Sequence, residues 1–322
     1  MSQNFRRLCM NRNNTNYPGF IKLYKTGKLA RRVKDIYQLM KNCQLCPRRC
    51  GVNRLKGELG YCRAGIEPEV SSFHSHFGEE PPISGWSGSG TVFFTHCNLR
   101  CVFCQNYPIS QLGYGNKISI EQLASIMLNL QKRGCHNINL VTPTHFTPQI
   151  VAALNIAAGK GLTIPLVYNC GGYESIQTLK LLEGIVDIYM PDIKYGGKKE
   201  AEKYSNAPDY FEVAKMAVKE MHRQVGDLQI SPDGIAKRGL LIRHLILPNN
   251  LARSERILKF IKDEVSPNSY ISIMSQYFPA YKAVQIPELN RKITKKEYQK
   301  VIGLAQKLSL EKGWRQELTE EA

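Results

Sequence analysis

The chain has 322 residues, of which 43% are hydrophobic and 22% are charged, as is ordinary for a soluble globular protein. No run approaches the roughly 20 apolar residues that a membrane-spanning helix needs. The net charge is +17, and the segment up to Lys56 contributes +13 of it, from 14 Lys and Arg against the one acid Asp35. The start, MSQNFRRLCMNR, lacks the apolar core of a secretory signal, so we expect a cytoplasmic protein with reduced cysteines.

Residues 1–90 are expected to form a basic N-terminal extension. An amphipathic helix in it places Leu29, Val33, Ile36 and Met40 on one face. We interpret this extension as a segment that packs on the main domain and leaves its positive charges in solvent. Binding of nucleic acid or of an acidic partner is the alternative, although no nucleic-acid recognition motif accompanies the charge.

Four cysteines follow with the spacing C-x2-C-x3-C-x11-C. This four-cysteine group consists of Cys43, Cys46, Cys50 and Cys62. Clustered cysteines in a reducing compartment are typical metal ligands. Four thiols can enclose zinc or hold an auxiliary iron–sulfur cluster, and the sequence leaves both open. Either would staple a segment with little core of its own.

After Gly90, short apolar runs alternate with helical patterns. The runs cover residues 91–95, 138–142, 165–169, 186–190, 240–247 and 270–274. Their lack of polar alternation is typical of parallel strands that are buried on both faces. Helix starts are predicted by capping boxes at Ser119 and Thr294, and by Thr147 as an N-cap before a proline.

Six βα units predict an α/β domain over residues 91–322. We expect a partial (β/α)6 TIM-like barrel, with a doubly wound sheet as the alternative. In both architectures the chemistry belongs at the carboxyl ends of the strands, where Cys97 follows the first run.

The stretch THCNLRCVFCQN, residues 95–106, holds Cys97, Cys101 and Cys104 and is called the three-cysteine loop below. A structural zinc site uses four protein ligands, and this loop supplies three. Three thiolates on a four-iron cube would leave one iron open for a small-molecule ligand. A zinc site with His96 or a distant residue as its fourth ligand is the alternative.

The spacing C-x3-C-x2-C, with Phe103 before the third cysteine, resembles the signature of the radical SAM superfamily. The resemblance implies a 4Fe–4S cluster on the three cysteines, with S-adenosylmethionine (SAM) on the open iron. It also implies an oxidoreductase in which an electron from the cluster cleaves SAM to a 5′-deoxyadenosyl radical that abstracts hydrogen from a substrate. A reductant such as flavodoxin or ferredoxin is the implied electron donor.

Three stretches, one of which includes the three-cysteine loop, are similar to radical SAM proteins related to pyruvate formate-lyase activating enzyme: NCQLCPRRCGVNRLKGELGYCRAG, HFGEEPPISGWSGSGTVFF and CNLRCVFCQNYPIS. This likeness implies a protein or peptide substrate, as in enzymes that activate glycyl radical proteins. Two alternatives are modification of RNA by the same chemistry and a non-catalytic, zinc-stapled binding protein.

The resemblance also implies which residues bind the cofactor. These are Phe103, Thr142, Thr144, Asn169, Asp192, Lys194 and Arg243. The family's Gly-Gly-Glu segment is replaced here by VTPTH, so its acid is missing.

Five of these predicted cofactor residues could instead have a structural role. Asp192 and Lys194 could form an ion pair, and Arg243 could pair with Asp192 instead of the cofactor carboxylate. The two threonines could cap the next helix.

Overall fold

A computed structural model of the chain describes residues 17–318. Seven strands pair in parallel and in the order of the chain. They are β2 (Ser89–Phe94), β4 (Ile138–Val141), β5 (Leu166–Cys170), β6 (Ile188–Pro191), β8 (Ala236–Leu245), β9 (Tyr270–Met274) and β10 (Gly313–Arg315). A doubly wound sheet would reverse its strand order, so that alternative is wrong. The sheet stays open between its two ends in the described chain, which confirms the partial barrel.

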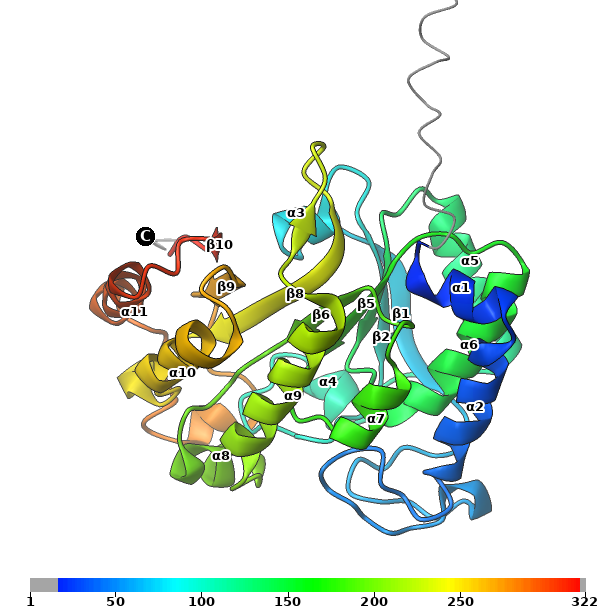
Figure 1. Cartoon of the computed structure of the whole chain (residues 1–322). Helices are drawn as coiled ribbons and strands as arrows, with labels where there is room; N and C mark the ends of the chain where they lie inside the picture. The colour runs from blue at the N-terminus through cyan, green and yellow to red at the C-terminus, as the bar shows by residue number, and fades with distance from the viewer. Residues whose placement is uncertain (1–16, 319–322) are drawn as a thin grey trace, which may run out of the picture.

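Helices cover the outer face of this curved sheet (Figure 1). They are α5 (Ile120–Lys132), α6 (Thr147–Gly159), α7 (Ile176–Leu181), α8 (Lys198–Ser205), α9 (Tyr210–Val225), α10 (Ser254–Phe260) and α11 (Lys295–Lys307). The capping boxes at Ser119 and Thr294 are confirmed. The N-cap assigned to Thr147 is wrong, because α6 already includes this residue and its hydroxyl bonds back to the carbonyl oxygens of Pro143 and Thr144. No helix in the described residues is long and apolar enough to cross a membrane.

The N-terminal segment packs on the barrel. Helices α1 (Gly19–Lys25) and α2 (Lys28–Gln38) lie against α6. On the expected apolar face, Leu29 and Ile36 of α2 are completely buried, Val33 is partly buried, and Met40 is buried just beyond the end of the helix. The buried Arg54 donates hydrogen bonds to the carbonyl oxygens of His145, at 2.7 Å, and Gly65, at 2.6 Å. The segment around the four-cysteine group is therefore fastened to the loop after β4.

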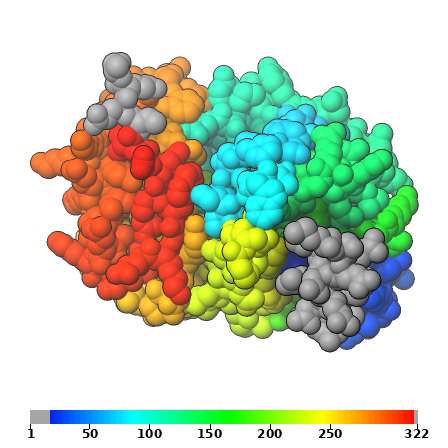
Figure 2. All heavy atoms as spheres, turned by 90° about the horizontal axis from the view of Figure 1, so that it is seen from above, coloured from blue at the N-terminus to red at the C-terminus, as the bar shows by residue number. Residues whose placement is uncertain are grey.

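Strand β1 (Glu69–His76) joins the same sheet. It pairs antiparallel with β2 and, at Glu69 and Val70, with β3 (Asn116–Lys117). The chain then passes through α3 (Pro81–Ser84) to the start of β2, across the amino-terminal end of the barrel. Figure 2 looks onto this end, where the cyan segment lies beside the red C-terminal segment. The boundary expected at residue 90 thus falls within one sheet, and the division into two domains stays a prediction.

Candidate functional site

A cavity of about 400 Å³ lies inside the open barrel. Its lining includes all three cysteines of the three-cysteine loop. His76 of β1 and Trp314 of β10 also line it, and these strands belong to opposite ends of the sheet. The cavity is therefore bounded by the two ends of the open sheet as well as by the carboxyl ends of its central strands.

The three-cysteine loop follows β2 and turns sharply. His96 and Arg100 adopt left-handed conformations, with φ of 65° and 54°. Each thiol has a polar neighbour in the chain. The N–H of Leu99 donates to Cys97 Sγ at 3.3 Å, the Ser205 hydroxyl donates to Cys101 Sγ at 2.9 Å, and the Ser110 hydroxyl lies 3.1 Å from Cys104 Sγ.

The surroundings of these thiols fit an iron–sulfur cluster. Burial, together with the smaller effect of the neighbouring Cys101 and Cys104, raises the pKa of Cys97 to about 12. Three thiolates gathered in such a place are costly unless a cationic metal centre compensates their charge. No three Cys, His, Asp or Glu side chains of residues 17–318 converge on a position for a single metal ion. The cysteine ligands of a cluster surround a cube of eight atoms and need no common point.

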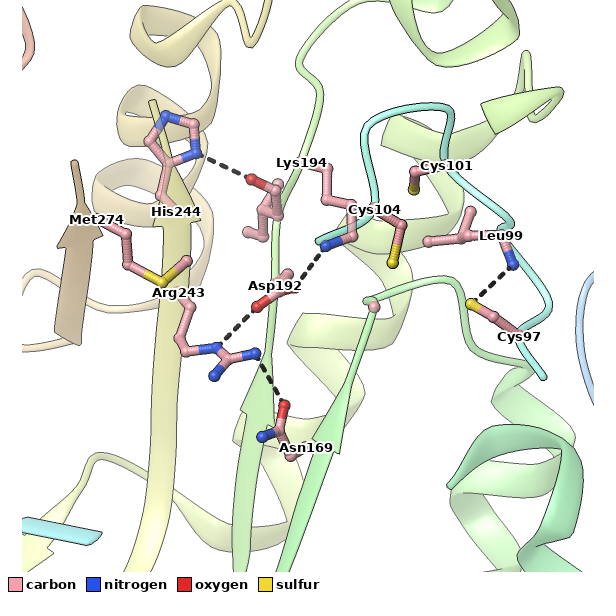
Figure 3. A network of polar contacts seen from close by, with 12 residues as sticks. Cys97, Leu99, Cys101, Cys104, Asn169, Asp192, Lys194, Arg243, His244 and Met274 are labelled. Carbon is pink, nitrogen blue, oxygen red and sulfur yellow. Dashed lines mark hydrogen bonds and ion pairs between the residues drawn. The ribbon is translucent and has the colours of Figure 1, made fainter. Parts of the chain in front are cut away.

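Opposite the thiols, four of the predicted cofactor residues form one polar network (Figure 3). Arg243 Nε donates to Asp192 Oδ1 at 2.7 Å, and Arg243 Nη2 donates to Asn169 Oδ1 at 2.9 Å. Lys194 Nζ lies 2.5 Å from Asp192 Oδ2. Burial would raise the pKa of Asp192, but Arg243 and Lys194 outweigh it and hold this pKa below its usual value. The carboxylate is therefore ionised and fixes both cations at the cavity wall.

The two ion pairs that were the structural alternatives for these residues are both formed. Asp192 and Lys194 form an ion pair, and Asp192 is a partner of Arg243. All three line the cavity, as do Asn169 and Thr142. These contacts leave their binding of the cofactor as a prediction.

Of the remaining two predicted cofactor residues, one lines the cavity and the other does not. Phe103 lines the cavity and packs edge-to-face between Tyr195 and Tyr277, with ring centroids 6.1 and 5.9 Å away. Thr144 does not belong to the lining, and its hydroxyl donates to the buried Glu174 at 2.6 Å. Thr144 therefore belongs to a buried hydrogen-bond network with Glu174 and Tyr168, and its binding of the cofactor stays a prediction.

Sequence reasoning missed Glu79 and Glu80, which line the cavity from the segment before β2. Glu79 Oε1 accepts from Asn139 at 2.9 Å, and Glu79 Oε2 lies 3.3 Å from Arg243 Nη1. The signal was present in HFGEEPP, an acidic pair within a segment rich in Gly and Pro.

The four-cysteine group forms a separate cluster of thiols. Cys43, Cys46 and Cys62 are buried and Cys50 is partly buried. Burial raises the pKa of Cys46 and of Cys62, and in both cases other thiols of the group raise it further. The N–H of Tyr61 donates to Cys50 Sγ at 3.4 Å. The group is compact enough for its charges to interact, and its metal stays a prediction.

The chain is similar to one protein family and to two proteins of a single organism. Residues 91–230 match the family described as the Radical SAM superfamily. Uncharacterized protein MJ0674 of Methanocaldococcus jannaschii is 32% identical over 295 residues, covering 89% of this chain and 81% of its own length. Uncharacterized protein MJ0808 of the same organism is 24% identical over 272 residues, covering 76% and 73%.

The similarity to solved structures is partial. HydG, a maturase of the FeFe-hydrogenase, aligns with a TM-score of 0.48 and 13% identity over 70% of this chain. The alignment spans 50% of the HydG chain.

Proposed function

The chain belongs to the radical SAM superfamily, and from that premise we propose that its three-cysteine loop holds the 4Fe–4S cluster at which SAM is cleaved. One observation carries the proposal: the three thiols and the network of Asn169, Asp192, Lys194 and Arg243 line the same cavity. When bound, a reduced cluster and SAM supply a 5′-deoxyadenosyl radical that abstracts a hydrogen atom, as expected of a radical SAM oxidoreductase.

The residues of the chain have distinct tasks in this proposal. Cys97, Cys101 and Cys104 would hold the cluster through three of its irons and leave the fourth for SAM. Lys194 and Arg243 present positive charge to the carboxylate of SAM, and Asp192 keeps both cations in place. Two aromatic rings pack against Phe103 and keep this part of the cavity apolar, which helps to exclude water.

Anaerobic reconstitution tests this function. The protein loaded with iron and sulfide is mixed with SAM and dithionite, and 5′-deoxyadenosine and methionine are quantified. We expect both products from wild type and from Cys135→Ala, whose buried thiol lies next to Ser75, away from the cavity lining. We expect neither from Cys104→Ala. Equal yields from Cys104→Ala and wild type would reject the proposal.

We also propose that the substrate is a protein or peptide that binds as an extended strand. Because β3 pairs with β1 only at Glu69 and Val70, no strand of the described chain covers the outer edge of β1 from Phe73 to His76. This free edge ends at His76, a cavity-lining residue. An open sheet edge offers backbone hydrogen bonds to an added strand.

Deuterium transfer distinguishes a peptide from an RNA substrate. Extracts of cells grown in deuterated medium are offered to the loaded enzyme, and deuterium in 5′-deoxyadenosine is measured by mass spectrometry. Pretreatment with a protease should abolish the transfer, and pretreatment with ribonuclease should leave it unchanged. The opposite pattern would favour RNA.

The four-cysteine group is proposed to hold an auxiliary iron–sulfur cluster. Its thiols lie close enough to raise one another's pKa, and a cluster takes four thiolate ligands of this kind. We further propose a flavodoxin or ferredoxin as the electron donor. A cytoplasmic location stays a prediction from the sequence.

A further inference from the structure

One side chain from the segment between Cys46 and Cys50 reaches the three-cysteine loop. Arg48 lies two residues after Cys46 and two before Cys50. Its Nε donates to the carbonyl oxygen of Asn98 at 2.9 Å, and Asn98 directly follows Cys97. The two cysteine groups are thus connected through one guanidinium.

The same guanidinium holds the end of α8. Nη2 of Arg48 donates to the carbonyl oxygen of Ser205 at 2.8 Å, and Nη1 donates to that of Asn206. The hydroxyl of Ser205 in turn donates to Cys101 Sγ at 2.9 Å. The N–H of Val102 donates to the carbonyl oxygen of Tyr204 at 2.9 Å, so the three-cysteine loop rests on the segment that Arg48 fixes.

Aromatic rings fix the guanidinium itself. It lies 4.0 Å from the ring centroid of Tyr61 and 5.2 Å from that of Tyr173. The carbonyl oxygen of Tyr173 also accepts a hydrogen bond from Asn98 Nδ2 at 2.8 Å. Tyr61 precedes Cys62, so both residues of the contact between Arg48 and Tyr61 are close in sequence to cysteines of the four-cysteine group.

We propose that Arg48 is a positioning residue through which a metal centre on the four-cysteine group orders the three-cysteine loop. A centre on Cys43, Cys46, Cys50 and Cys62 fixes the short segment that carries Arg48. Arg48 then fixes the backbone at Asn98 and Ser205, and with it the hydroxyl that donates to Cys101. The inference rests on the proposed function for the identity of both metal centres. It adds that the first centre controls the geometry around the second.

Hydrogen exchange tests the coupling without any turnover. The full chain carrying Cys97→Ala, Cys101→Ala and Cys104→Ala retains only the four-cysteine group as a cluster site. Amide exchange across residues 98–103 is measured before and after loading with iron and sulfide. We expect loading to slow this exchange about tenfold, since charge-assisted hydrogen bonds are worth about one order of magnitude or more.

The matched controls are Arg48→Ala and Arg49→Ala in the same background. Arg49 is the exposed neighbour of Arg48, so its variant should show the full slowing. Arg48→Ala should show none. Equal slowing in both variants, no slowing in the parent chain or no uptake of iron by it would each overturn the proposal.

A second measurement uses the chain with all its cysteines. Hydrogen bonds to ligand sulfur stabilise the reduced form of a cluster, so Arg48→Ala should lower the midpoint potential of the cluster on the three-cysteine loop. Arg48→Lys should restore part of the shift, and Arg49→Ala should leave the potential unchanged. An unchanged potential in Arg48→Ala would contradict the proposal even if 5′-deoxyadenosine still formed. If wild type itself formed no 5′-deoxyadenosine, the proposed function would be rejected instead.

Discussion

Arg243 and Asp192 contact each other through both backbone and side chains. The two residues form a parallel β-bridge, and the N–H of Ile193 donates to the carbonyl oxygen of Arg243 at 2.9 Å. Their side chains add the ion pair of 2.7 Å between Nε and Oδ1. Because Arg243 also contacts Asn169 and Glu79, one guanidinium on β8 joins β5, the residue after β6 and the segment before β2. This explains how an arginine can lie in an apolar strand.

Asp192→Asn should weaken SAM binding and lower stability. Lys194 and Arg243 would lose the carboxylate that holds them, so we expect affinity for SAM to fall at least about tenfold in anaerobic equilibrium dialysis. Breaking a buried ion pair on one side costs about 3–5 kcal/mol of the free energy of unfolding. The control is Glu255→Gln, which breaks an exposed ion pair with Lys259 and should cost at most about 1 kcal/mol. Unchanged SAM affinity in Asp192→Asn would show that the pair is purely structural.

Glycine is required at position 172, in the turn after β5. Gly172 has a φ of 75°, and a Cβ there would lie 2.3 Å from the carbonyl oxygen of Asp192. Gly172→Ala should therefore cost at least about 2 kcal/mol and disturb the adjoining network. Gly303→Ala is the matched control, because a Cβ in this part of α11 would meet nothing within 4 Å. It should stabilise the protein by about 0.5–1 kcal/mol in thermal or urea unfolding, and similar losses in both variants would contradict the argument.

The buried Glu174 should make stability depend on pH. Burial raises its pKa from 4.5 to about 7, against the lowering effect of the Thr144 and Tyr168 hydroxyls. Between these values the folded chain keeps a proton that the unfolded chain has released. Stability should therefore fall as the pH rises from about 4.5 to 7, by on the order of 3 kcal/mol, and then level off.

The measurement compares melting temperatures of wild type and Glu174→Gln between pH 5 and 8. The amide cannot titrate, so the advantage of wild type over the variant should shrink as the pH rises to 7. Asp187 is also buried with a raised pKa, but it is common to both proteins and cancels in the difference. Parallel curves would mean that Glu174 does not hold the proton.

Metal content should separate the two cysteine groups. We expect about eight irons in reconstituted wild type and about four in Cys46→Ala or Cys104→Ala, because each variant disrupts one cluster. Only Cys46→Ala should retain a cluster whose electron paramagnetic resonance spectrum changes when SAM is added. If Cys104→Ala bound zinc and Cys46→Ala did not, the four-cysteine group would be a zinc site and not the site of an auxiliary cluster.

Local features of the fold could be predicted residue by residue. The capping boxes at Ser119 and Thr294 depend on side chains three residues apart, and the buried strands depend on short apolar runs. Thr144 and Glu174 show the limit of that approach, because 30 residues separate a hydroxyl from the carboxylate that it contacts. No rule of sequence spacing predicts this contact, because the distance between the two side chains depends on how β4 and β5 pair.

The sequence by itself determined the spacing of the three cysteines, their place after the first barrel strand and the succession of βα units. These properties depend on neighbours along the chain, where covalent geometry limits the outcomes. Only the tertiary structure decided that Glu79 enters the cavity from the opposite end of the barrel and that Arg48 reaches Asn98. Those contacts join segments separated by dozens of residues, and their positions are fixed by the packing of the whole open barrel.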